Sequence, residues 1–340
     1  FMYEQDEITS FIENKPFKPY YSYLGQFGIL LGFIGLGFIV AAFIQLGVGY
    51  SLMEKNVPMQ KWGEAIIKAM MKPENINVTR WLQIISAAVM FLLPVLFTTM
   101  IISKKPVPYM GFNAIATKNQ VFTVVGIAFL AILLSGVLGE INSKIPIPKN
   151  WEFTFKKLEE DYNSQVLLMA RMNNFAEYVF VMIVIALAPA IFEEVCFRSG
   201  LQQILINWTK QPIVAIVITS AIFSAIHFSY YGFLPRFALG LLLGLIFYYS
   251  KNIWFSILMH LLNNGISVTA IYLTSVNGKP KQEVLDSNMG LTVSLTATAL
   301  VGIVVLTGIT YLMQQFKKQS EQLPTIDPIT YLKKDNNPFV

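Results

Sequence analysis

Six polar side chains in one otherwise apolar stretch have types and spacing suited to acid–base chemistry. They are Glu193, Glu194, Arg198, His227, His260 and Asn264. The chain has two histidines in 340 residues, and both lie in this stretch. An ionisable side chain at the depth of a lipid bilayer costs a few kcal/mol at least, so each such group needs a partner or a function. The cluster therefore predicts a reaction centre inside a membrane.

The two adjacent glutamates are expected to differ in role. Glu194 and Arg198 are four residues apart, so on a helix they share a face and suit an ion pair. Glu193 then remains free to face a cavity, where poor solvation raises the proton affinity that a general base needs. Pro189 removes a backbone hydrogen bond and predicts a bend beside this group. The alternative is a purely structural Glu–Arg clamp between helices, which leaves Glu193 without a partner.

The remaining polar groups suit water activation and charge stabilisation. His260 and Asn264 stand at i and i+4, on one face of a helix. Together they can donate hydrogen bonds to one oxygen, as the oxyanion of a tetrahedral intermediate requires. His227 with Glu193 can hold and deprotonate a water molecule. Asn263 is expected to point elsewhere.

A metal site is the alternative chemistry for the same atoms. Glu193, His227 and His260 are a sufficient ligand set for Zn²⁺, with water in the fourth position. Their spacing is not that of the HExxH pattern. We therefore expect no metal and no other cofactor, with zinc as the open alternative.

The composition places these residues in a membrane. Apolar residues make up 54% of the chain, charged residues make up 13%, and the mean hydropathy is +0.54. A soluble domain would carry about 25% charged residues. The net charge of +5 is modest and forms no basic stripe, so nucleic acid is not an expected partner.

Eight segments approach the roughly 20 apolar residues that a helix needs to cross a bilayer. They are expected at about 27–50, 81–103, 121–141, 175–197, 211–229, 232–250, 252–275 and 290–314. Each should be an α-helix, because lipid offers backbone groups no other partner. Glycines in the first segment, and Gly240 with Gly244 in the sixth, predict close helix packing.

The connections complete an all-α polytopic architecture. Residues 51–80 and 150–174 alternate charged and apolar groups, which predicts amphipathic helices on the membrane surface. The expected organisation is a polar N-terminal segment at 1–26, a membrane domain at 27–314 and a polar tail at 315–340. The catalytic core spans about 175–275.

Localisation follows from loop charges and from the N-terminal residues. The Lys104–Lys105 pair and the basic tail favour both termini in the cytoplasm. The first 26 residues show no cleavable signal peptide, and the chain has a single cysteine, Cys196. These features fit a bacterial plasma membrane.

Three motifs on successive predicted helices resemble those of the CPBP family. They are EExxxR at Glu193–Arg198, FxxxH at Phe223–His227 and HxxxN at His260–Asn264, and the likeness covers about residues 180–270. This family comprises the CAAX proteases and bacteriocin-processing (Abi) proteins, which are intramembrane endopeptidases.

The resemblance implies a role for each site residue. It implies that Glu193 activates water with His227, that His260 and Asn264 hold the oxyanion, and that Glu194 and Arg198 support the site. It favours a metal-free mechanism and a type II CAAX endopeptidase-like protein.

We therefore predict an intramembrane endopeptidase that cleaves a peptide or protein near the membrane surface. The substrate is expected to be lipidated or hydrophobic. A second hypothesis is a membrane scaffold or regulatory subunit that keeps the family fold and binds a partner protein in a membrane complex. A proton-coupled transporter would also explain buried ionisable groups, but the sequence lacks paired broken helices in two corresponding halves.

Overall fold

The computed structural model describes residues 19–112, 115–275, 295–324 and 327–334. The regular elements in these residues are all helices. Seven of the described helical segments are long and apolar enough to cross a membrane. The prediction of an all-α polytopic membrane protein is confirmed.

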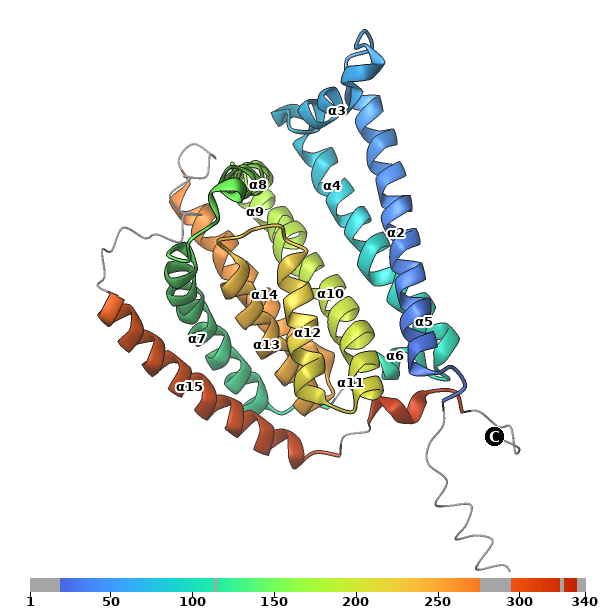
Figure 1. The fold of residues 1–340 in the computed structure, drawn as a ribbon, viewed down its shortest axis with the longest axis vertical. Helices are drawn as coiled ribbons and strands as arrows, with labels where there is room; N and C mark the ends of the chain where they lie inside the picture. Colours follow the sequence, from blue (N-terminus) through green and yellow to red (C-terminus); the bar gives the residue numbers. More distant parts are fainter. Residues whose placement is uncertain (1–18, 113–114, 276–294, 325–326, 335–340) are drawn as a thin grey trace, which may run out of the picture.

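The long segments form the body of the molecule (Figure 1). They are α2 (Tyr23–Leu52), α4 and α5 (Ile76–Ala87 and Leu93–Ile102), α7 (Lys118–Ser143), α9 to α11 (Phe175–Val181, Ala188–Glu194 and Gln203–Thr209), α13 (Phe233–Ser250), α14 (Ile253–Thr274) and α15 (Leu295–Glu321). The shorter helices are α3 (Trp62–Met70), α6 (Pro106–Tyr109), α8 (Lys149–Met169) and α12 (Pro212–Ala225). Short 3₁₀ segments cover Met59–Lys61, Pro73–Asn75 and Pro328–Tyr331.

The structure differs from the eight predicted spans in its middle. The fourth span runs from Phe175 to Thr209, well beyond the predicted end at 197. The predicted fifth span at 211–229 contains only α12, whose 14 residues rise about 21 Å and fall short of a bilayer core. The helix ends before His227 because the chain turns there, with Phe228 at a φ of 50°.

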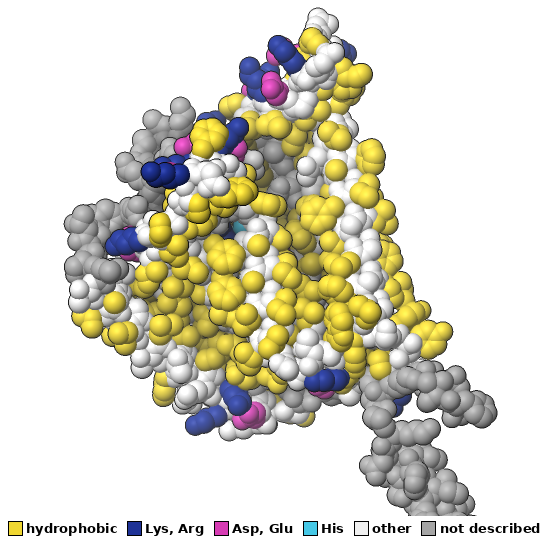
Figure 2. Space-filling view, in the orientation of Figure 1, with side chains coloured by type: hydrophobic (Ala, Val, Ile, Leu, Met, Phe, Trp, Pro, Cys, Tyr) yellow, Lys and Arg dark blue, Asp and Glu magenta, His cyan; other side chains and the backbone are white. Residues whose placement is uncertain are grey.

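Two large apolar cores hold the helices together. In Figure 1, α2, α4 and α5 make one edge of the molecule, α7 and α15 make the other, and α10 to α14 lie between them. One apolar core joins α7, α13, α14 and α15, and another joins α2, α5 and the α10–α11 region. Figure 2 shows a broad hydrophobic band with charged side chains gathered at its two ends, as expected of a membrane-spanning surface.

Close helix packing occurs at some of the predicted glycines. A Cβ added to Gly240 would stand 2.9 Å from Ser220 of α12, and one on Gly244 would stand 2.8 Å from Gln202. In α2, a Cβ on Gly37 would lie 2.5 Å from the Val89 carbonyl oxygen, whereas one on Gly35 would meet nothing within 4 Å. The prediction of close packing is therefore confirmed for both glycines of α13 and only at particular glycines of α2.

The two connections predicted to be amphipathic contain helices. The 51–80 connection holds α3 and the start of α4, and α8 covers most of 150–174. The buried side chain of Arg80 in α4 donates hydrogen bonds to the carbonyl oxygens of Met169 and Arg171. It thereby fixes the carboxyl end of α8 against the membrane helices.

The C-terminal region is more structured than a polar tail. Helix α15 continues to Glu321. Further on, the Ser103 side chain and the Lys104 N–H both donate to the Tyr331 carbonyl, at 3.0 and 2.9 Å. Leu332 is buried with Ile102 and Tyr109.

Candidate active site

The helix that carries both glutamates is irregular on either side of them. Helix α10 lies between two π-helical segments, Met182–Leu187 and Val195–Gln202. Pro189 is its second residue and has no N–H to give to the Ile185 carbonyl four residues earlier. Asn264 of α14 supplies the missing donor, with its Nδ2 3.3 Å from that carbonyl oxygen. A side chain on a neighbouring helix therefore compensates for the proline.

Glu194 is the centre of a buried polar chain. Its Oε2 accepts a hydrogen bond from Arg198 Nε at 2.9 Å, and its Oε1 lies 3.0 Å from His260 Nδ1. The Glu194 and Arg198 side chains are completely buried. The predicted ion pair is confirmed, and it is tied to the histidine of α14 as well.

The polar chain extends beyond the residues singled out in the sequence. Arg198 Nη1 lies 3.4 Å from Gln202 Oε1, and Gln202 Nε2 donates to the Gly244 carbonyl at 3.0 Å. Sequence reasoning missed Gln202, although it continues the four-residue spacing of Glu194 and Arg198. That repeat was the available signal.

Glu193 faces the same histidine from the other side. Its Oε2 lies 4.0 Å from His260 Nε2, and its side chain keeps 15% of its surface exposed. The ionised Glu194 can only accept a hydrogen bond, so the proton of a neutral His260 sits on Nδ1. His260 Nε2 then presents a lone pair toward Glu193. Glu194 therefore orients the His260 ring, and Glu193 lies near its Nε2.

His227 lies beside this cluster without touching Glu193. It stands in the turn after α12, and its Nδ1 donates to the Phe223 carbonyl at 2.8 Å. The Phe223 ring packs against both histidines, with centroid distances of 5.2 Å to His227 and 5.9 Å to His260. The described residues show no hydrogen bond or ion pair between His227 and Glu193. Phe223, which the sequence marked only as part of the FxxxH motif, packs between the two imidazoles.

The asparagine pair differs from expectation. Asn263 Nδ2 donates to Asn264 Oδ1 at 3.1 Å, so the prediction that Asn263 points elsewhere is wrong. Asn264 in turn holds the Ile185 carbonyl and keeps one N–H free. Its side chain is thus positioned from two directions.

The residues of the alternative zinc set do not converge as metal ligands. Among the described residues, no three His, Cys, Asp or Glu side chains are arranged to hold a metal ion. Both Nδ1 atoms already have protein acceptors.

Together, the helical bundle and this cluster define a polytopic membrane protein with a buried carboxylate–histidine site. Residues 175–266 match the family model described as Type II CAAX prenyl endopeptidase Rce1-like. The match spans all six predicted site residues and confirms the resemblance carried by the three motifs. It supports, at the level of class, an intramembrane CAAX-type protease. Searches of curated proteins and of solved structures gave no match to the chain.

Proposed function

We propose that this chain is an intramembrane endopeptidase that hydrolyses a peptide bond near the membrane surface. The observation that carries the proposal is the approach of Glu193 Oε2 to His260 Nε2, which lie 4.0 Å apart. Two acceptors at that separation can share one water molecule at ordinary hydrogen-bond distances of about 2.8 Å. The family match supports a hydrophobic or lipidated C-terminal peptide as substrate.

The reaction follows from those positions. Glu193 takes a proton from the shared water, and the resulting hydroxide forms a bond to the carbonyl carbon of the substrate. The carbon–nitrogen bond then breaks, and the proton passes from Glu193 to the leaving nitrogen. Glu194 keeps the His260 ring in place throughout.

The remaining groups act on the developing charge. The free N–H of Asn264 donates to the oxyanion. His260 Nε2 accepts the other hydrogen bond of the water and orients it. His227 has its Nδ1 proton committed to Phe223, so its Nε2 is a second proton acceptor beside the site. Its part is to accept a hydrogen bond that helps to orient the attacking water.

Replacement of Glu193 by glutamine tests the proposal. Glutamine keeps the shape of the side chain and removes its basicity, so cleavage should fall by about 10² to 10⁴-fold. The measurement is hydrolysis of fluorogenic prenylated and unprenylated C-terminal peptides by wild type and Glu193→Gln in detergent, each with and without a chelator. The Lys156→Gln variant on the exposed face of α8 is the control.

Each outcome decides one part of the proposal. Cleavage by Glu193→Gln at the wild-type rate would remove Glu193 from the reaction. Loss of wild-type cleavage on chelation would replace the water-only mechanism with a metal-dependent one. We expect chelation to leave the rate unchanged.

A further inference from the structure

Arg236, in the first turn of α13, is a cation that the proposed chemistry does not use. Its guanidinium lies over the Tyr162 ring of α8, with Cζ 4.9 Å from the ring centroid. Its Nη1 is buried and has no hydrogen-bond partner among the described residues, and no described carboxylate lies within ion-pair distance. A buried donor of this kind is costly unless an acceptor reaches it. An acceptor supplied from outside the chain would satisfy this donor.

The guanidinium lies next to the proposed active site. Arg236 is close enough to interact electrostatically with both Glu193 and His227. It also adjoins Ser229: a Cβ on Gly232 would stand 1.9 Å from Arg236 Nη1 and 2.7 Å from Ser229 Oγ. Ser229 follows His227 by two residues, so the arginine and the histidine flank the same turn.

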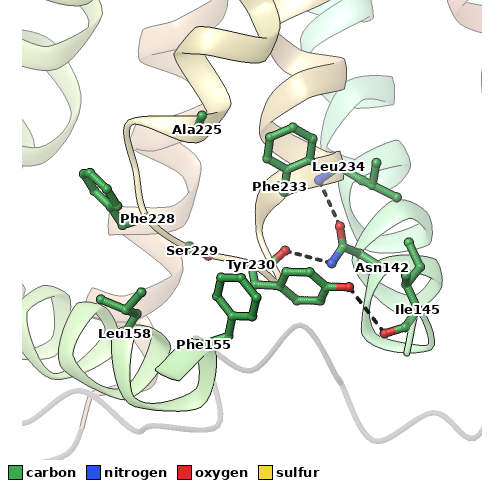
Figure 3. A pocket seen from close by; sticks show the side chains of 10 residues that line it. All are labelled: Asn142, Ile145, Phe155, Leu158, Ala225, Phe228, Ser229, Tyr230, Phe233 and Leu234. Carbon is green, nitrogen blue, oxygen red and sulfur yellow. Dashed lines mark hydrogen bonds between the residues drawn. The ribbon is translucent and has the colours of Figure 1, made fainter. Parts of the chain in front are cut away.

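That turn forms one wall of an apolar pocket of about 350 Å³. Figure 3 shows Phe155 and Leu158 of α8 on one side and Ala225, Phe228 and Ser229 on the other. The turn is held by Asn142 of α7, which donates to the Tyr230 carbonyl at 2.8 Å and accepts from the Leu234 N–H at 3.0 Å (Figure 3). The pocket is large enough for one bulky apolar side chain.

An apolar pocket lies beside a guanidinium whose Nη1 has no partner among the described residues. This combination matches the chemistry of a peptide's last residue, which joins an apolar side chain to a free carboxylate. We propose that Arg236 binds the C-terminal carboxylate of the peptide substrate, with Tyr162 supporting the guanidinium and the pocket taking the terminal side chain. This assignment rests on the proposed peptidase function and adds the direction in which the substrate lies. Arg236 is then a substrate-binding residue that fixes which bond reaches Glu193.

The structural alternative is a pair between Arg236 and Glu159. Glu159 lies one turn before Tyr162 on α8, and its Oε2 is also buried without a hydrogen-bond partner among the described residues. If the two groups serve only to hold α8, their removal changes stability and not the choice of ligand. The test must therefore compare two ligands that differ only in the carboxylate.

The experiment measures equilibrium binding of two fluorescent peptides of one sequence, ending in an apolar residue as the free acid or as the amide. The Glu193→Gln variant in detergent is the parent protein, so that no peptide is cleaved. We expect the parent to bind the acid about tenfold more tightly than the amide, since a charged hydrogen-bonded pair is lost in the amide. Adding Arg236→Gln should remove the preference, whereas adding Glu159→Gln or Lys156→Gln should not.

Gly232→Ala is a sharper variant because it keeps every charge. Gly232 has φ −90° and ψ 3°, which alanine adopts without strain. Its new methyl group would occupy the space of Arg236 Nη1 and displace the guanidinium. This variant should also bind acid and amide equally.

Three results would overturn the inference: no binding of either peptide by the parent, equal binding of acid and amide by the parent, or a preserved preference in Arg236→Gln or Gly232→Ala. Cleavage by wild type separates this inference from the proposed function. Equal cleavage of both peptides keeps the peptidase and removes the subsite. A preference in binding without any cleavage keeps the subsite and removes the peptidase.

Discussion

At the residue scale, the two adjacent glutamates have different roles: Glu194 stabilises the structure, and Glu193 is available for chemistry. Both oxygens of Glu194 are engaged, one by Arg198 and one by His260, in a fully buried setting. Glu193 has no such anchors, retains some exposure and faces His260 across 4.0 Å. The residue with fewer partners is therefore the one available to a substrate.

This division predicts different consequences for two chemically identical substitutions. Glu194→Gln leaves Arg198 as an uncompensated buried charge and should lower the free energy of unfolding by about 3 kcal/mol or more. Glu193→Gln leaves no such charge and should change stability much less. Thermal unfolding in detergent measures both, and equal shifts in the two variants would contradict the assignment.

The sequence was informative about this polar chain where the groups lie on one helix. The four-residue spacing of Glu194 and Arg198 was enough to predict their ion pair. The bond from His260 to Glu194 was not predictable, because it depends on how α10 and α14 are rotated against each other. The same reason explains why Arg236 went unnoticed: its importance comes from Tyr162 of α8, which only the fold places beside it.

At the element scale, α10 shows how a broken helix is kept inside a membrane. Its proline has no N–H to give to the Ile185 carbonyl, and Asn264 on the helix of the third motif donates to that carbonyl instead. The N–H that Pro189 lacks on one helix is thus replaced by the Asn264 side chain on another. The break in turn sets the orientation of the two glutamates that follow it.

A double-mutant cycle measures this compensation. Asn264→Ala in the wild-type background should cost about 1 to 3 kcal/mol of unfolding free energy, because it leaves a buried carbonyl unpaired. In a Pro189→Ala background the backbone N–H returns, and the same substitution should cost distinctly less. Additive effects would show that Asn264 does not serve the Ile185 carbonyl.

Element boundaries were predicted well where hydropathy changes sharply and poorly where tertiary contacts decide. The span at Phe233–Ser250 agrees closely with the predicted 232–250. Helix α12 was predicted too long because its continuation is apolar, yet Asn142 captures the following turn through the Tyr230 and Leu234 backbone. No local pattern in 211–229 indicates that the following turn has a hydrogen-bond partner about 90 residues away in the sequence.

At the scale of the whole molecule, one glycine sets how closely α2 approaches the neighbouring helix. Gly37 lies directly against the π-helical segment Ala88–Leu92, where the Val89 carbonyl would be 2.5 Å from an added Cβ. Gly35, half a turn away, faces open space within 4 Å. The π segment and the glycine therefore set how closely the edge helix approaches.

Two alanine variants of the same helix test that contact. Gly37→Ala should lower stability by about 1 to 3 kcal/mol through overpacking. Gly35→Ala should be neutral or slightly stabilising, because alanine is the better helix former. Thermal unfolding of the two variants in detergent compares them directly, and a neutral Gly37→Ala would show that α2 can shift away freely.

The segment 328–334 has a consequence for how the molecule is completed during synthesis. It closes the ends of α2 and α5 through the Ser103–Tyr331 hydrogen bond and the burial of Leu332. These partners are separated by 228 positions along the chain. All the described membrane helices are therefore synthesised before residues 328–334 can pack against the ends of α2 and α5. Until residues 328–334 are made, the surface that they cover on α2 and α5 stays exposed. A nascent chain paused before residue 328 would present that surface to a chaperone or a protease.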